Sequence, residues 1–182
     1  MREPSEETSG GERQGGVRHG SVTGPRDGIV TGPRDGIVKD ALVEAISLVW
    51  IKKYDEALAY IRTFRGTNKD KGDLLEYFIA WIFCRLGFHA VVSGGPSDGG
   101  CDVRVYDGGE LYQVIQCKNL NRKMSQDEIF NEAGKFERNF PYHHNFRIVS
   151  VSGFSRPKNG QKAEPYRDNS LLTGPDEIKE LL

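Results

Sequence analysis

Apolar residues recur at helical spacing from Lys39 to Phe64, a stretch that contains neither Gly nor Pro. The recurring positions are Leu42, Ala45, Ile46, Val49, Trp50, Ala57, Leu58 and Ile61. This pattern predicts one long amphipathic helix, or two helices with a break near Lys52–Asp55. No residue in the stretch points to catalysis, so its expected role is packing against the core or against a second copy of the chain.

A second helix is predicted beyond a polar break at Gly66–Gly72. From Asp73 to Leu86 the chain is apolar on nearly every side of a helix, which is typical of a buried helix, and Gly87 is suited to end it. A third helix is expected at 125–139, where Ser125 followed by Glu128 forms a capping box. A short helix is expected at 176–182.

Strands are predicted between these helices. The apolar segments are 89–93, 101–106, 111–118 and 146–151, with a glycine-rich loop at 94–100 and a hairpin turn at Asp107-Gly108-Gly109. The order of elements is therefore a helix, three strands, a helix, a strand and a helix. This order predicts an α/β fold with a mixed sheet flanked by helices.

The N-terminal segment differs from the rest of the chain. Residues 1–37 carry almost no large apolar side chains, and the eight-residue unit TGPRDGIV occurs twice in succession. Because Gly-Pro and Asp-Gly pairs favour turns and bury little, we expect a disordered tail. A linker is favoured over an arm that follows DNA, since acidic residues offset the arginines. The predicted organisation is a tail at 1–37, a helical element at 38–66 and a folded domain at 67–182.

Composition narrows the class of protein. The chain has 182 residues and a formal net charge of −1, so its overall charge does not indicate nucleic-acid binding. A local basic surface is still compatible with that net charge. No segment reads as a membrane span or a signal peptide, which predicts a cytoplasmic protein. The cysteines at 84, 101 and 117 show no zinc-binding spacing, and reduced core thiols are expected.

Three polar residues are predicted to meet at one end of the hairpin. Gln116 and Lys118 alternate along the return strand and therefore share a face, and Asp102 begins the partner strand. The turn then places Asp102 within a residue or two of Gln116. A carboxylate offers hard oxygen ligands for Mg²⁺, and a nearby lysine is suited to stabilise charge on a phosphate. The combination predicts phosphodiester hydrolysis.

The same residues carry a family resemblance. Asp98-Gly99-Gly100-Cys101-Asp102, followed after thirteen residues by Gln116-Cys117-Lys118, resembles the PD-(D/E)xK nuclease superfamily, and most of all its Mrr-type branch, in which glutamine often replaces the acid. Lys71–Glu76 is also similar to the opening helix of those enzymes and of archaeal Holliday-junction resolvases. The resemblance implies a restriction-endonuclease-like α-β-β-β-α-β core.

The resemblance also implies roles for individual residues. Asp102 would be the shared metal carboxylate, Lys118 the catalytic lysine, and Gln116 a second ligand, with the carbonyl of Cys117 beside it. Glu76 would be the acid from the opening helix, and Asp98, Gly99 and Gly100 would lie on the substrate side. The implied metal is Mg²⁺, with Mn²⁺ as a substitute. A neutral amide at position 116 would hold Mg²⁺ less strongly than a carboxylate would.

The expected function is therefore a metal-dependent endonuclease acting on double-stranded or branched DNA, working as a homodimer in restriction or DNA processing. Two alternatives stay open. One is a nuclease-fold module that binds nucleic acid with weak or no cleavage, and the other is a structure-specific nuclease similar to Holliday-junction resolvases. A small-molecule phosphate enzyme is disfavoured, because the chain has no phosphate-binding loop or dinucleotide fingerprint.

Overall fold

The computed structural model describes residues 32–33, 36–93, 100–142, 145–155 and 172–182. Three helices come first: α1 (Gly36–Trp50), α2 (Tyr54–Thr63) and α3 (Asn68–Arg85). The alternative of two helices is confirmed for the first stretch, and Lys52 adopts a positive φ of 60° at the break. Helix α1 begins at Gly36, inside the segment that was expected to be a tail, because Val38 is fully buried in the core.

The polar break predicted at Gly66–Gly72 is wrong for most of its length, because α3 already begins at Asn68. The Thr67 hydroxyl accepts a hydrogen bond from the backbone N–H of Asp70, and the Asp70 carboxylate accepts one from the backbone N–H of Thr67. This capping box supplies partners for two backbone donors that a helix start otherwise leaves unpaired. Glu76 is consequently in the interior of α3 and not in its first turn.

The sheet has five strands in the order β1-β2-β3-β4-β5: β1 (His89–Val92), β2 (Val103–Asp107), β3 (Glu110–Lys118), β4 (Phe146–Ser150) and β5 (Leu172–Thr173). The first three strands are antiparallel, and β3, β4 and β5 are parallel. The mixed sheet is confirmed. The predicted hairpin turn is confirmed too, since Gly108 and Gly109 between β2 and β3 both have positive φ. Sequence reasoning missed β5.

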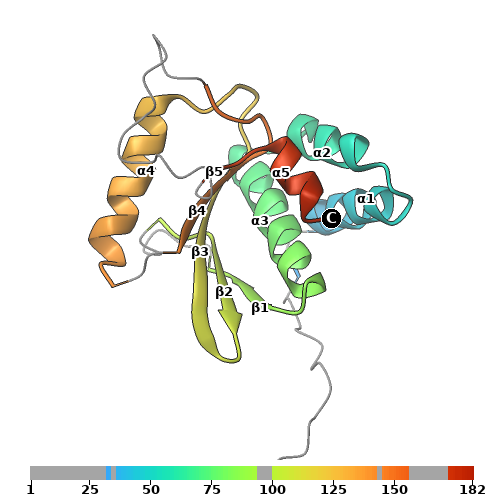
Figure 1. The fold of residues 1–182 in the computed structure, drawn as a ribbon. Helices are drawn as coiled ribbons and strands as arrows, with labels where there is room; N and C mark the ends of the chain where they lie inside the picture. Colours follow the sequence, from blue (N-terminus) through green and yellow to red (C-terminus); the bar gives the residue numbers. More distant parts are fainter. Residues whose placement is uncertain (1–31, 34–35, 94–99, 143–144, 156–171) are drawn as a thin grey trace, which may run out of the picture.

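Helices cover both faces of this sheet (Figure 1). Helix α3 packs on one face together with α1, α2 and α5 (Pro175–Glu180), and the core there includes Ile115 and Cys117 of β3. Helix α4 (Gln126–Asn139) packs on the other face, where Val114 lies in a smaller core with Ile129 and Phe136. The protein is therefore a mixed α/β fold in which Ile115 and Cys117 of β3 face α3, whereas Val114, Gln116 and Lys118 face α4.

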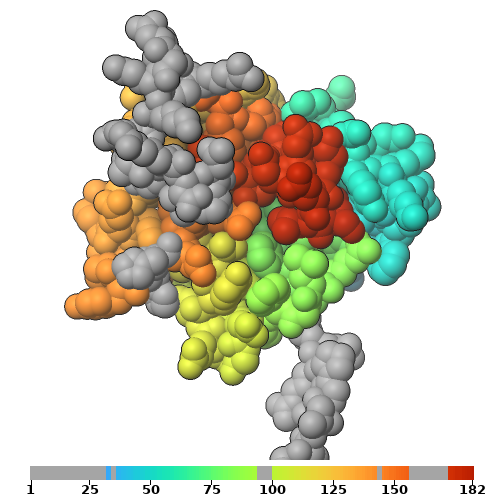
Figure 2. Space-filling view, viewed as in Figure 1, coloured from blue at the N-terminus to red at the C-terminus, as the bar shows by residue number. Residues whose placement is uncertain are grey.

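The closing helix α5 lies at the surface beside α2 (Figure 2). Lys179 of α5 joins the two helices through an ion pair with Asp55 at 2.9 Å. None of the helices among the described residues has the length and apolar character that a membrane span requires.

Candidate active site

Asp102 lies in a bend just before β2 and is fixed by the backbone on both sides. Its N–H donates to the carbonyl of Ile115 in β3 at 2.9 Å, and its own carbonyl accepts from the N–H of Ser93 at 2.8 Å. Because Val103 is paired with Ile115 in the β2–β3 register, Asp102 falls opposite Gln116, as the hairpin predicted. Two flanking segments therefore determine where the carboxylate stands.

The Asp102 carboxylate contacts two groups of β3 directly. Its Oδ2 accepts from the backbone N–H of Cys117 at 2.6 Å and from Nε2 of Gln116. Gln116 is only 5% exposed, so this amide–carboxylate contact is nearly shielded from water. With Nε2 toward Asp102, the amide oxygen lies on the side of Gly100, where a Cβ would stand 3.5 Å from Oε1. Gly100 has a φ of +82°, which glycine adopts without strain.

Lys118 ends β3 on the face toward α4. Its Nζ lies 3.2 Å from Oε1 of Glu132, and the Lys118 side chain is 28% exposed against 11% for Glu132. The same Glu132 oxygen is 3.0 Å from Nζ of Lys135, one helical turn further along α4. Two ammonium groups therefore hold one nearly buried carboxylate, which satisfies the requirement that a buried charge be paired.

Glu132 is a site residue that sequence reasoning missed. A signal for it exists: Glu132 stands three residues after Ile129 and four before Phe136, so it lies on the apolar face of α4. An acid at such a position requires a partner in the core. Lys118 is that partner. The local sequence pattern could not identify it, because the packing of α4 against β3 is a tertiary contact.

Gly100 connects the two parts of the site. A Cβ at this glycine would lie 3.5 Å from Gln116 Oε1 and also 3.5 Å from the Cβ of Lys135. One contiguous cluster is therefore formed by Asp102, Gln116, Gly100, Lys135 and Glu132. Lys118 adjoins this cluster through its ion pair with Glu132. Asp98 and Gly99, also expected on the substrate side, fall outside the described residues.

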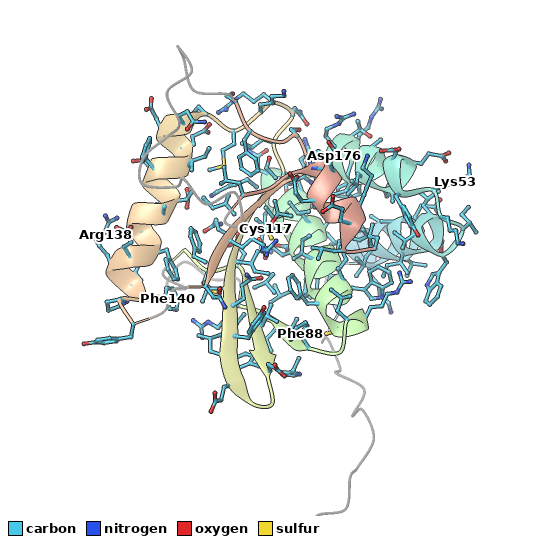
Figure 3. All side chains as sticks on the ribbon, in the orientation of Figure 1. Lys53, Phe88, Cys117, Arg138, Phe140 and Asp176 are labelled. Atoms are coloured by element: carbon cyan, nitrogen blue, oxygen red, sulfur yellow. The ribbon has the colours of Figure 1, made fainter. Side chains whose placement is uncertain are left out.

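Cys117 points to the opposite face of β3, at the centre of the molecule (Figure 3). Burial first, and then the charges of Asp102 and Glu76, raise the pKa of its thiol well above the ordinary value. Glu76 belongs to α3, which packs on the face of the sheet that carries Cys117, opposite the face that carries Lys118. The structure shows direct contacts within two pairs, Asp102–Gln116 and Lys118–Glu132, whereas a ligand role for Glu76 stays a prediction.

A metal here would need mixed ligands. Within the described part of the chain, no three side chains drawn from His, Cys, Asp and Glu are grouped as a metal site. The ligand set that we expect combines the Asp102 carboxylate, the Gln116 amide oxygen and the Cys117 carbonyl, with the Glu76 carboxylate from α3. All of these are hard oxygen donors of the kind that Mg²⁺ accepts, and they fit such an ion chemically.

Comparisons of this chain with models of known families, with curated proteins and with solved structures found no match.

Proposed function

We propose that this protein is a metal-dependent endonuclease of the PD-(D/E)xK type that hydrolyses DNA phosphodiester bonds. The observation that supports the proposal most is the contact of Asp102 with Gln116 and Cys117 at the end of the hairpin where Lys118 and Glu132 form an ion pair. A carboxylate, an amide and a lysine lie at this end of β2 and β3, and the proposed chemistry would use all three. The α-β-β-β-α-β order from α3 to β4 also agrees with the proposed fold.

The chain would hold Mg²⁺ through Asp102, the carbonyl of Cys117 and the amide oxygen of Gln116, whose amide would first have to turn its oxygen from Gly100 toward Asp102. In an antiparallel ladder the N–H and C=O of one residue point the same way, so the Cys117 carbonyl is expected on the side of Asp102, as its N–H is. Bound there, the ion would neutralise charge on the scissile phosphate and favour attack by water.

Lys118 would act on the phosphate itself. Its ammonium is charged and partly exposed, so it is suited to donate a hydrogen bond to a phosphate oxygen as negative charge develops. Glu132 would position Lys118, because an ion pair from a nearly buried carboxylate restricts the rotamers of the long lysine chain. Glu132 is also an acid in the same cluster as Gln116, the position at which this chain has an amide instead of the acid of the PD-(D/E)xK pattern.

A second candidate is a nuclease-fold module that binds DNA without efficient cleavage. The observation that favours it is the mutual pairing within the site: Asp102 is bound by Gln116 and Cys117, and Lys118 by Glu132. Such pairs stabilise each other and need no metal to be satisfied.

The purified chain challenged with plasmid, linear, single-stranded and four-way-junction DNA tests the proposal. We expect cleavage with Mg²⁺ or Mn²⁺ and none with EDTA. Binding without cleavage under all metal conditions would favour the second candidate. Preference for the four-way junction would identify a structure-specific nuclease.

A further inference from the structure

A surface depression with a volume of about 400 Å³ lies where α2, α3 and the segment after β3 meet. Three of its lining side chains are cationic and none is acidic; the lining residues are Arg62, Thr63, Phe64, Arg65, Lys71 and Asn121. In a chain whose net charge is −1, this makes a local concentration of positive charge. We call it the Arg62–Lys71 depression.

The positive charge of this depression is not offset by neighbouring ion pairs. Within the described residues, Arg62, Arg65 and Lys71 form no ion pair. Two acids of the adjoining helix start have other partners. Asp70 accepts from the Thr67 backbone in the capping box, and Asp73 pairs with Lys69. The charges of the depression are therefore available to an anion from solution.

The depression is tied to the end of β3 by Asn119, the residue after Lys118. Its Nδ2 donates to the carbonyl of Ile61 in α2 at 3.0 Å and to that of Lys71 in α3 at 2.9 Å. Asn121, in its lining, is three residues beyond Lys118. Three residues of extended chain span at most about 10 Å. The depression and the end of β3 are therefore close enough for nearby phosphates of one DNA strand to reach both.

We infer that the Arg62–Lys71 depression binds a backbone phosphate of the DNA strand that enters the Asp102–Lys118 site. This inference rests on the proposed function and adds the direction in which the DNA backbone extends from the active site. Two exposed arginines, a half-buried lysine and an amide are suited to a phosphodiester, because guanidinium groups match phosphate oxygens bidentately. The location near the end of β3, with Asn121 three residues after Lys118, favours a phosphate within a polymer over free phosphate.

The test measures DNA affinity as a function of salt. Fluorescence anisotropy of a short labelled duplex, in EDTA so that no cleavage occurs, would compare the wild type with Arg62→Ala, Lys71→Ala and the double variant. Each lost phosphate contact should reduce the slope of log affinity against log salt by about one. The double variant should bind roughly tenfold more weakly at moderate salt. The Lys71→Ala substitution keeps the backbone carbonyl of residue 71, so the hydrogen bond that this carbonyl accepts from Asn119 is retained.

Arg85→Ala is the matched control. It removes an exposed positive charge from the other end of α3, about 21 Å from Lys71 at 1.5 Å per residue, and should leave the slope unchanged. The charge-conserving Lys71→Arg should restore binding. Melting temperatures of all variants, measured in parallel, identify any loss that comes from unfolding.

Two results would overturn the inference. One is a wild-type slope and affinity in the double variant. The other is competition by millimolar inorganic phosphate at constant ionic strength that equals competition by unlabelled duplex, which would assign the depression to free phosphate. Failure of the proposed function is distinguishable: a wild type that never cleaves, while Lys71→Ala still weakens binding, refutes the nuclease and keeps the depression. A double variant that binds and cleaves normally, while Lys118→Ala does not cleave, refutes the depression alone.

Discussion

Nζ of Lys118 lies 3.2 Å from Oε1 of Glu132, which joins the last residue of β3 to the covering helix α4. Glu132 is nearly buried, so its charge depends on Lys118 and Lys135 for compensation. The lysine that we propose to act on the phosphate is thus held by an acid outside the Asp102–Gln116–Lys118 pattern. The site consists of two contacting pairs, Asp102–Gln116 and Lys118–Glu132, and a separate prediction tests each pair.

Glu132→Gln should lower the rate of metal-dependent cleavage by about 10- to 100-fold, as the loss of a group that orients a functional side chain typically does. The amide keeps the size of the side chain but releases the ammonium of Lys118. Cleavage rates at saturating and at limiting DNA would separate an effect on turnover from one on binding. Glu137→Gln, at an exposed position of the same helix, is the control and should cleave normally. Equal rates for Glu132→Gln and wild type would show that Lys118 needs no positioning.

Gln116→Glu should destabilise the metal-free protein and make its stability depend on Mg²⁺. The substitution replaces a buried donor to Asp102 by a second carboxylate, which removes a hydrogen bond to a charged group and adds like-charge repulsion. The expected cost in unfolding free energy in EDTA is about 2 kcal/mol or more. Added Mg²⁺ should raise the melting temperature of this variant more than that of the wild type, because two carboxylates hold a hard cation better than one.

Thermal melts of both proteins with EDTA and with Mg²⁺ check this. Equal melting temperatures in EDTA would contradict the Asp102–Gln116 contact. Equal Mg²⁺ responses would remove Gln116 from the ligands that we propose.

Stability at low pH should depend on Glu128, the acid of the α4 capping box. Hydrogen bonds from Arg122 first, and then from Ser125, lower the pKa of Glu128 from 4.5 to about 2. A lowered folded-state pKa contributes stability that is complete above the unfolded value and lost as pH falls toward the folded one. Glu128→Gln should therefore lower the unfolding free energy near neutral pH by about 1 kcal/mol, a cap-sized effect kept small by exposure of the ion pair.

Urea unfolding of wild type and Glu128→Gln over a range of pH checks this. The difference should be constant above about pH 5 and shrink as pH falls from there toward 2. A difference that grows on acidification would contradict the assigned direction.

The three thiols should react at different rates. Cys101 and Cys117 are buried, and burial is the main cause that raises the pKa of both, so little thiolate is available to a reagent. Cys84 is half-buried on α3. In the folded protein a thiol-reactive dye should give one faster phase, and Cys84→Ser should abolish it. Simultaneous reaction of all three thiols without denaturant would contradict the buried positions.

The parts of this structure that could be predicted from sequence are those that local pattern determines. Alternation along β3 placed Gln116 and Lys118 on one face, and the short glycine turn placed Asp102 opposite Gln116. The glycines on either side of Thr67–Asp70 favour a break, so the pattern hides the capping box. The hydrogen bonds of that box stabilise the start of α3 more than Gly72 destabilises its second turn. Strand β5 has two residues, too few to show alternation.

Glu132 marks the limit of local pattern in the site. Its position on the apolar face of α4 is visible in the sequence, but the identity of its partner depends on which sheet face the helix covers. The same holds for the Arg62–Lys71 depression, whose lining residues come from α2, α3 and the segment after β3. Long-range juxtapositions of this kind come from packing.

The most direct test of the central claim is the initial rate of supercoiled plasmid cleavage with Mg²⁺, measured for the wild type, Lys118→Ala and Asp102→Asn purified in parallel. Asp102→Asn is preferred to Asp102→Ala because it keeps an oxygen acceptor for the Cys117 N–H. We predict that the wild type nicks and linearises the plasmid, that EDTA stops it, and that both variants are slower by about 100-fold or more while melting cooperatively. Wild-type rates in either variant would contradict the proposed active site, and no cleavage by the wild type with Mg²⁺ or Mn²⁺ would contradict the proposed activity.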